Sequence, residues 1–306
     1  MAAGDEVAIG VSVFLVSLLA LIWYSLVEVA ICRLVKKNST FIILATQALT
    51  DIFMLVHYAA LGIEIVVQET LPISNQLQFF LINAGWIPGL GLTILLAANR
   101  THLILFPLKY EHFWSPRRTT FLVTLVCLLG IGLDTILAFG FQGDPNDGGY
   151  HIHAPSMFTF AALDRTTQKA KILKQVLIPM HYGTVLIALA IYLLSFVRIL
   201  KEKWQNKTDH HIFHASDNHK REWKVQKRLS IICFANYIPF ALYITIHFAY
   251  PPNCRGLALV KTVFGLANSA INSILMATFS TLVRRKLPLL KLGHNAVDTL
   301  SLSDRR

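Results

Sequence analysis

The chain has 306 residues, of which 54% are hydrophobic and only 15% are charged, and its net charge is +11. Average soluble domains carry roughly 25% charged residues, so this composition excludes a disordered chain, a collagen-like or coiled-coil fibre and an ordinary soluble domain. Four cysteines in such a length are too few for a disulfide-stapled secreted scaffold, which leaves an integral membrane protein.

Seven stretches of the sequence are apolar and long enough to cross a bilayer as helices, which takes about 20 residues. The first is too long for the core of a cleavable signal peptide, so we expect an uncleaved span. The apolar segment 154–163 is too short to span and is placed in the loop 142–171. The sequence therefore predicts an all-α membrane protein, a bundle of seven helices over residues 7–32, 41–67, 78–106, 119–141, 172–200, 229–250 and 256–280.

The orientation of these spans follows from the basic residues. The loops after spans one, three and five, the adjoining ends of spans three and five, and the C-terminal tail hold 22 of the 28 Lys and Arg residues. Because cytoplasmic loops carry the excess of basic residues, the N-terminus is predicted to lie outside. The positive charge then reflects topology and attraction to the inner leaflet of the lipid bilayer, and no nucleic acid is expected as a partner. The glycosylation sequons at Asn38 and Asn206 should remain unmodified.

Short motifs recur in the spans in an order that is more specific than any one of them. They are, in chain order, Ala48-Leu49-Thr50-Asp51, Asn99-Arg100-Thr101, Phe106-Pro107-Leu108, Pro179, Asn236-Tyr237-Ile238-Pro239, Asn272-Ser273-Ile274-Leu275-Met276 and the amphipathic segment 281–292. This order resembles the rhodopsin-like G-protein-coupled receptors, and the Asn-Arg and Phe-Pro-Leu motifs resemble the serpentine chemoreceptors of nematodes, of the Srx or Srv type. The resemblance implies a receptor domain over 1–292, with a short amphipathic helix after span seven, and a cytoplasmic tail over 293–306.

Polar residues inside the spans predict an internal cluster. A lipid-facing ionised Asp51 would cost roughly 2.5–3.5 kcal/mol, so Asp51 should face the bundle. Asn268, Ser269, Asn272 and Ser273 are spaced to lie on one stripe of span seven, which could satisfy Asp51. The resemblance implies that this cluster is an activation switch with a sodium ion as a candidate occupant; the alternative is a static hydrogen-bond network. We expect no other cofactor and no structural metal.

The resemblance also assigns activation roles beyond Asp51. Arg100 would hold the inner ends of the helices together and be released on activation, although a snorkelling boundary arginine explains its position equally well. Asn99 replaces the family's aspartate and cannot form its ion pair, so Glu111 or Glu222 would have to supply one. The complete set of predicted switch residues is Asp51, Asn99, Arg100, Tyr237, Pro239 and Asn272.

The ligand site is expected in the outer half of the bundle. Ile82 stands where amine receptors carry an aspartate, which argues against a biogenic amine. Lys174, His181, His247 and Lys261 near the mouth favour a neutral or acidic small molecule. The candidate contacts, each of which could instead be a packing residue, are Ile82, Asn83, Trp86, His181, Tyr243, His247, Phe264 and Asn268. Asn75 stands where the family usually has a cysteine, and the loop 142–171 has none, so no outer disulfide is expected.

A heterotrimeric G protein is the partner implied at the cytoplasmic side, with plasma-membrane localisation, in the ciliary membrane of sensory neurons. The predicted docking residues, which could also serve topology alone, are Arg117, Arg118, Lys203, Lys224, Lys227 and Arg228. Hydrolase and nucleotide-binding motifs are absent from the sequence, so an enzyme is not expected. The alternative function is a small seven-span transporter, but the two halves of the chain show no repeat in span length or Pro/Gly placement.

Overall fold

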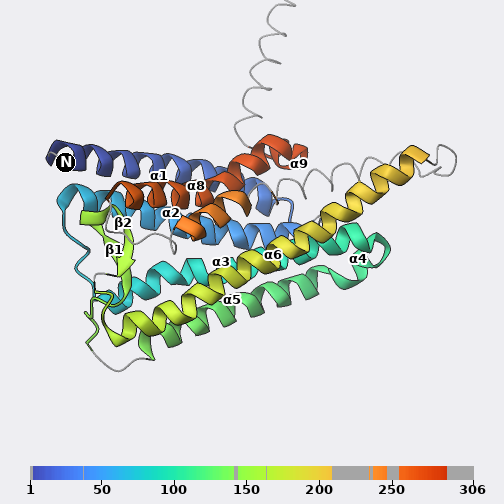
Figure 1. The fold of residues 1–306 in the computed structure, drawn as a ribbon. Helices are drawn as coiled ribbons and strands as arrows, with labels where there is room; N and C mark the ends of the chain where they lie inside the picture. Colours follow the sequence, from blue (N-terminus) through green and yellow to red (C-terminus); the bar gives the residue numbers. More distant parts are fainter. Residues whose placement is uncertain are drawn as a thin grey trace, which may run out of the picture.

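The computed structural model of the chain describes residues 3–36, 38–140, 144–162, 164–208, 234, 237–246 and 255–287. Six helices in this part are long and apolar enough to cross a membrane, and a shorter apolar helix, Tyr237–Ile246, accompanies them. The long helices are α1 (Ala3–Cys32), α2 (Thr40–Val67), α3 (Asn75–Leu105), α5 (Pro116–Phe139), α6 (Gln168–Thr208) and α8 (Arg255–Phe279). They lie side by side as a bundle (Figure 1).

The predicted spans correspond to these helices with small shifts at their ends. The largest shift is in α6, which continues to Thr208 although the apolar run ends near residue 200. A span ends where the side chains become charged, whereas a helix ends where its backbone hydrogen bonds stop, so the two need not coincide. Span six, predicted over 229–250, is represented by the helix Tyr237–Ile246 within the described residues. Two short helices, α4 (Pro107–Phe113) and α9 (Thr281–Arg284), follow α3 and α8.

Small residues set the distance between neighbouring helices in the bundle. A Cβ on Gly62 of α2 would lie 2.6 Å from the backbone nitrogen of Phe14 in α1, and a Cβ on Gly130 of α5 would lie 2.9 Å from Pro88 of α3. Apolar lipid tails provide no hydrophobic drive between helices, so close backbone packing of this kind holds membrane helices together. Leu19, Phe121 and Leu186 are exposed on the outside of the bundle, where a multi-pass membrane protein contacts lipid.

A β-hairpin in the segment 151–162 is the main feature that the sequence did not predict. Strand β1 (His151–Ala154) pairs antiparallel with β2 (Thr159–Ala162), with His151 opposite Ala162, and a 3₁₀ turn, η1 (Pro155–Met157), joins them. The segment 154–163 lies in the loop between α5 and α6, and what the sequence analysis missed is the pair of strands within that loop. Seven of the eight strand residues are buried. Strand β2 (Thr-Phe-Ala-Ala) lacks the polar–apolar alternation that signals a strand, and the alternation of β1 (His-Ile-His-Ala) covers only four residues.

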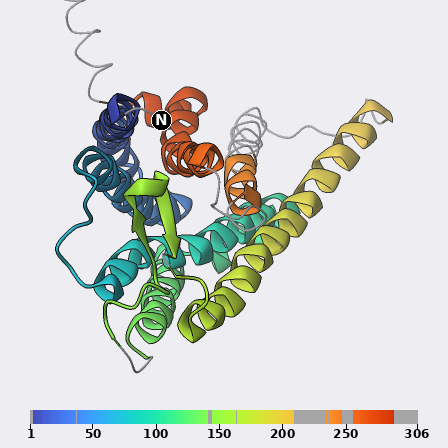
Figure 2. The ribbon, with the colours of Figure 1, turned by 60° about the vertical axis from the view of Figure 1, so that its left-hand side comes forward.

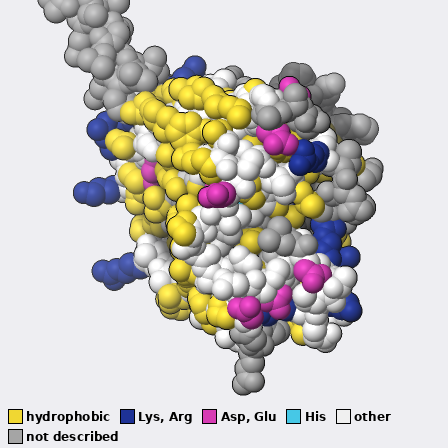
Figure 3. Space-filling view, turned by 90° about the vertical axis from the view of Figure 1, so that its left-hand side faces the viewer, with side chains coloured by type: hydrophobic (Ala, Val, Ile, Leu, Met, Phe, Trp, Pro, Cys, Tyr) yellow, Lys and Arg dark blue, Asp and Glu magenta, His cyan; other side chains and the backbone are white. Residues whose placement is uncertain are grey.

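The hairpin closes one end of the bundle, which we call the hairpin end; α1 begins at the same end (Figures 1 and 2). It lies over the ends of α2, α3 and α8 (Figure 2). Seen from outside, this end carries scattered acidic and basic side chains, with an apolar patch along one margin (Figure 3). The opposite end, the far end, holds α4 and α9 (Figure 1).

Candidate functional site: two cavities that share a wall

A cavity lies directly beneath the hairpin, and we call it the hairpin cavity. Its volume is about 40 Å³, measured as space open to the centres of water molecules. A single water needs roughly 10–15 Å³ by this measure, so the cavity has room for about three waters. Four helices and both strands contribute its lining, which consists of Met54, Ile82, Asn83, Trp86, His151, Phe160, Leu177, His181 and Tyr243.

Five of the eight predicted ligand residues line this one cavity, namely Ile82, Asn83, Trp86, His181 and Tyr243. The other three do not. Phe264 is half-buried and packs against the core, Asn268 lines a second cavity closer to Asp51, and His247 lies outside the described residues. The depth of a residue within its span was the basis of the prediction, and depth alone could not assign each side chain to one of two neighbouring cavities.

Trp86 and His181 form a bonded pair in the wall of the hairpin cavity. The indole Nε1 of Trp86 donates to Nε2 of His181 at 2.5 Å, and the two rings stack with centroids 5.9 Å apart. An indole can only donate, so Nε2 is the acceptor and Nδ1 carries the hydrogen, which it donates to the carbonyl oxygen of Leu177 at 2.5 Å. Both nitrogens of His181 are therefore engaged, and the ring of Tyr243 packs edge-on against Trp86.

The hairpin is fastened to the helices by buried polar contacts that the sequence analysis missed. Nδ1 of His153 in β1 lies 2.5 Å from Oε2 of Glu64 in α2, and Oε1 of Glu64 accepts from the backbone nitrogen of Leu71 at 2.8 Å. From α8, Lys261 donates to the carbonyl oxygen of Phe160 at 2.5 Å, and Thr262 donates to that of Phe158. Glu64 carried the same signal as Asp51, an acidic residue inside an apolar span.

Asn75 binds the loop that follows α5. It stands where the receptor family usually has a cysteine that forms a disulfide. Its Nδ2 donates to the backbone oxygen of Asn146 at 2.8 Å, and the backbone nitrogen of Gln76 donates to the oxygen of Pro145 at 2.8 Å. The start of α3 is thus joined by hydrogen bonds to the loop that follows α5. Cys32 and Cys127, the cysteines within the described residues, are both free.

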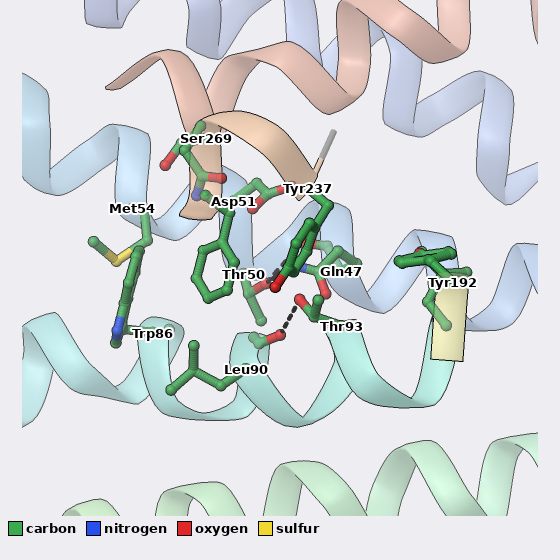
Figure 4. A pocket seen from close by; sticks show the side chains of 15 residues that line it. Gln47, Thr50, Asp51, Met54, Trp86, Leu90, Thr93, Tyr192, Tyr237 and Ser269 are labelled. Atoms are coloured by element: carbon green, nitrogen blue, oxygen red, sulfur yellow. Dashed lines mark hydrogen bonds between the residues drawn. The ribbon is translucent and has the colours of Figure 1, made fainter. Parts of the chain in front are cut away.

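The second cavity surrounds Asp51 and is called the Asp51 cavity (Figure 4). Its volume of about 50 Å³, measured in the same way, gives room for about three to five waters. The lining combines polar and aromatic side chains and consists of Gln47, Thr50, Asp51, Met54, Gly85, Trp86, Gly89, Leu90, Thr93, Leu96, Tyr192, Tyr237, Phe240, Asn268 and Ser269. Met54 and Trp86 line both cavities, so these two side chains form the wall between them.

The structure brings Asp51 and Asn272 together and adds a third residue. The hydroxyl of Tyr24 in α1 donates to Oδ2 of Asp51 at 2.6 Å, while Nδ2 of Asn272 lies 3.0 Å from that hydroxyl and 3.5 Å from Oδ2. All three residues are buried. Tyr24 was not singled out because a tyrosine is common in membrane helices and nothing in its spacing points to α2.

Asp134 in α5 contrasts with Asp51. Its side chain is fully buried, yet neither carboxylate oxygen has a hydrogen-bond partner within the described part of the chain. The two aspartates therefore do not form a bonded pair of the kind that an intramembrane aspartyl enzyme would need.

Near the far end, Asn99 takes part in a polar cluster that joins three helices. Its Oδ1 accepts from Thr40 of α2 at 2.9 Å, and its Nδ2 donates to the hydroxyl of Tyr110 in α4 at 3.1 Å. The neighbouring Arg100 is only 1% exposed, which is unlike a snorkelling arginine at a membrane boundary. Glu111, one of its two proposed partners, is exposed on α4, and Glu222 lies outside the described residues.

The remaining predictions concern two switch residues, the docking residues and the C-terminal tail. Tyr237 donates to the carbonyl oxygen of Val185 in α6, and Pro239 is half-buried two residues further along the same helix. Arg117 and Arg118 are exposed at the start of α5. The side chain of Lys203, all of Lys224, Lys227 and Arg228, and the tail 293–306 lie outside the described residues.

Comparison with known proteins identifies the class of molecule to which these cavities belong. A family model described as "Serpentine type 7TM GPCR chemoreceptor Srx" matches residues 14–254. The crystal structure of squid rhodopsin is similar to this chain, with a TM-score of 0.71 and 12% sequence identity. The alignment covers 93% of this chain and 80% of the rhodopsin chain, which shows a shared fold. No curated protein matches the sequence.

Proposed function

Because the chain belongs to the Srx family of serpentine seven-transmembrane chemoreceptors, a family of receptors and not of enzymes, we propose that it binds a small extracellular molecule in the hairpin cavity and signals to a heterotrimeric G protein. The ligand is a neutral or acidic molecule and not a biogenic amine, since no carboxylate stands among the described residues that line this cavity. The N-terminus and hairpin face outward, the far end faces the cytoplasm, and the receptor works in the plasma membrane, in the cilia of sensory neurons.

The observation that carries this proposal is the wall shared by the two cavities. A ligand that enters the hairpin cavity contacts Trp86 from one side, and the polar Asp51 cavity lies on the other. Trp86 also packs against Tyr243 and Phe240, both in the helix Tyr237–Ile246. Displacement of one indole would therefore move that helix and rearrange the polar cavity together. A ligand shifts the equilibrium between two arrangements of the helices only if its affinity for the two arrangements differs. Contact with the shared wall gives the ligand that difference in affinity.

The second half of the proposed mechanism concerns the far end, which we place on the cytoplasmic side. Asn99 joins α2, α3 and α4, and Thr101 bonds Ser195 of α6 at 2.5 Å, so a movement of α6 bears on the segment that holds Arg100. The G protein would dock at this end on the exposed Arg117 and Arg118. The other docking residues, which are predicted from the sequence alone, are Lys203, Lys224, Lys227 and Arg228. Rearrangement of packed helices at one end of a bundle is a common way to open a docking groove.

Expression of the full chain in cultured cells with a G-protein reporter tests the proposal. A panel of small odorants should include compounds that raise the signal, and the signal should disappear when the G protein is absent. Surface labelling of an N-terminal tag, and the absence of glycans at Asn38 and Asn206, should show the outward N-terminus. Concentrative uptake of a compound without any G-protein signal would contradict the receptor function and favour a transporter.

A further inference from the structure

Asn83 of α3 brings an unused hydrogen-bond acceptor to the lining of the hairpin cavity. The residue is 6% exposed, and its Nδ2 donates to the carbonyl oxygen of Phe79, one turn earlier, at 2.9 Å. A carbonyl oxygen can only accept, so this bond fixes which branch of the amide is Nδ2 and which is Oδ1. Within the described structure, no group donates a hydrogen bond to Oδ1.

The Oδ1 atom of Asn83 is unpartnered but is not sealed inside the protein. The side-chain atoms of the described residues that are both sealed and unpartnered include Nε2 of Gln78 in the same helix, but not Oδ1 of Asn83. A small molecule in the cavity can therefore reach this oxygen. Polar atoms in protein interiors are nearly always hydrogen-bonded, so an accessible acceptor of this kind indicates an exchangeable partner, either water or a ligand.

The other polar side chains of the cavity wall already interact with the protein. Nε1 of Trp86 and both ring nitrogens of His181 take part in hydrogen bonds, and His151 and Tyr243 have interactions of their own. The rest of the lining is apolar and consists of Met54, Ile82, Phe160 and Leu177. A ligand therefore meets a hydrogen-bond acceptor at Asn83 and mostly hydrocarbon and aromatic rings elsewhere.

The residues that line the cavity carry no charge that could pair with a charged ligand. None of them is Lys, Arg, Asp or Glu. Burial, and then the charges of Lys261 and Arg165 and the ring of His181, lower the pKa of His151 to about 3, so His151 is neutral near pH 7. His181 is neutral as well, because its Nε2 accepts from Trp86. A charged ligand would lose its hydration here without gaining a counter-charge, which favours the neutral class of ligand.

The volume and the single acceptor together select the kind of neutral molecule. Room for about three waters corresponds to a ligand of about three to five non-hydrogen atoms. An alcohol that displaces water from Oδ1 keeps the hydrogen bond and buries its hydrocarbon part against the apolar wall. A ketone of the same size has no hydrogen to donate, so Oδ1 would lose its partner.

We propose that the hairpin cavity binds short neutral alcohols, whose hydroxyl donates a hydrogen bond to Oδ1 of Asn83 and whose hydrocarbon part lies against Ile82 and Leu177. Alcohols of about two to four carbons match the volume. This inference rests on the proposed function, because it specifies the ligand of the same receptor site.

The first test compares matched compounds on the full-length receptor. Saturation-transfer NMR in lipid nanodiscs measures binding, and empty nanodiscs correct for partition into lipid. Each alcohol is paired with the ketone of equal size, isopropanol with acetone and cyclobutanol with cyclobutanone, and butyrate and butylamine supply the two charges. Alcohols should bind saturably and at least about fivefold more tightly than the ketones and the charged compounds. If the second hydrogen of Nδ2 held the ligand instead, ketones would bind equally well.

Two variants of Asn83 differ by one hydroxyl. Asn83→Thr keeps an acceptor, because a helical threonine donates its hydroxyl to the carbonyl one turn earlier and still accepts from a ligand, whereas Asn83→Val has the same shape without that oxygen. Alcohol binding should be about 5- to 50-fold weaker in the valine variant than in the threonine variant, and ketone binding should be equal in both. Thr184→Val removes a hydroxyl that bonds Met180 outside both cavities and should change little.

The same compounds are applied to cells that carry the G-protein reporter, so that binding and signalling are judged separately. Ketones that bind as tightly as alcohols, tighter binding of a charged compound, no saturable binding of any alcohol, or equal alcohol binding in the threonine and valine variants would overturn the alcohol site. The comparison of alcohols with ketones needs no variant and decides the matter if the variants do not fold. Selective alcohol binding without a G-protein signal would sustain the site and overturn the receptor function. A G-protein signal from ketones or charged compounds, with inert alcohols, would do the reverse.

Discussion

The indole nitrogen of Trp86 donates to Nε2 of His181 across 2.5 Å, and the same indole separates the hairpin cavity from the Asp51 cavity. His181 is fixed in turn by the carbonyl oxygen of Leu177 in its own helix. The wall between the cavities is therefore held by a hydrogen bond between α3 and α6 and by the packing of Trp86 against Phe240 and Tyr243. A ligand that competes for His181 would remove the hydrogen bond.

Trp86→Phe should lower stability and weaken the ligand response. The substitution leaves the buried Nε2 of His181 without its donor, which costs about 1–3 kcal/mol. The matched control is Trp23→Phe, because the buried indole nitrogen of Trp23 has no hydrogen-bond partner within the described structure and its loss should cost nothing. Melting temperature in nanodiscs measures both. Equal losses in the two variants would show that ring volume matters and the hydrogen bond does not.

Asp51 and Asn272 should be energetically coupled through the signalling equilibrium. Asp51→Asn and Asn272→Ala should each change the G-protein response at normal surface expression, and the double variant should depart from additivity by more than roughly 0.5 kcal/mol. Tyr24→Phe should change the G-protein response as Asp51→Asn does, because it removes the hydroxyl that donates a hydrogen bond to Asp51. Combining Asp51→Asn with Asn75→Ala, at the distant start of α3, gives the additive reference. Strict additivity of the first pair would contradict a shared network.

Glu64→Leu should release the hairpin, because it removes the acceptor of both His153 and the backbone of Leu71. Leaving a buried hydrogen-bonding group without its partner typically costs about 1–3 kcal/mol. Glu64→Gln keeps an oxygen for Leu71 and should be milder, and the double variant Glu64→Leu, His153→Leu should recover part of the loss. Protease cleavage within 144–162 measures release of the hairpin. A double variant as labile as Glu64→Leu alone would argue against the pair.

Asp134→Leu should stabilise the protein. Both carboxylate oxygens are buried without hydrogen-bond partners within the described residues, and such a group costs about 1–3 kcal/mol. Asp51→Leu is the matched comparison and should destabilise, because Asp51 accepts a hydrogen bond from Tyr24. Melting temperatures of the two leucine variants should shift in opposite directions. A loss of stability in Asp134→Leu would reveal a partner for that carboxylate.

Reducing agent should leave ligand response and stability nearly unchanged, because hydrogen bonds from Asn75 join α3 to the loop that follows α5. Asn75→Ala should instead lower stability by about 0.5–1.5 kcal/mol. Thermal unfolding with and without dithiothreitol measures both effects. A large drop on reduction of the unmodified protein would point to a disulfide through Cys254, which lies outside the described residues.

The sequence by itself determined the class of the protein and the depth of its polar groups. Bilayer thickness sets the length of an apolar run, so the spans could be located from composition alone. The cost of a charge in lipid required Asp51 to face inward, and helical spacing identified the stripe of span seven that carries Asn272. The family motifs, in their order, indicated a receptor.

The tertiary structure decided which inward-facing groups meet. Tyr24 reaches Asp51, Glu64 reaches His153, and Lys261 reaches Phe160 across 27, 89 and 101 residues of sequence. Only the rotation of each helix about its axis, and the fold of the hairpin, bring these partners within reach. Because lipid is as apolar as the core, the hydrophobic pattern does not fix that rotation; close packing at Gly62, Pro88 and Gly130 does.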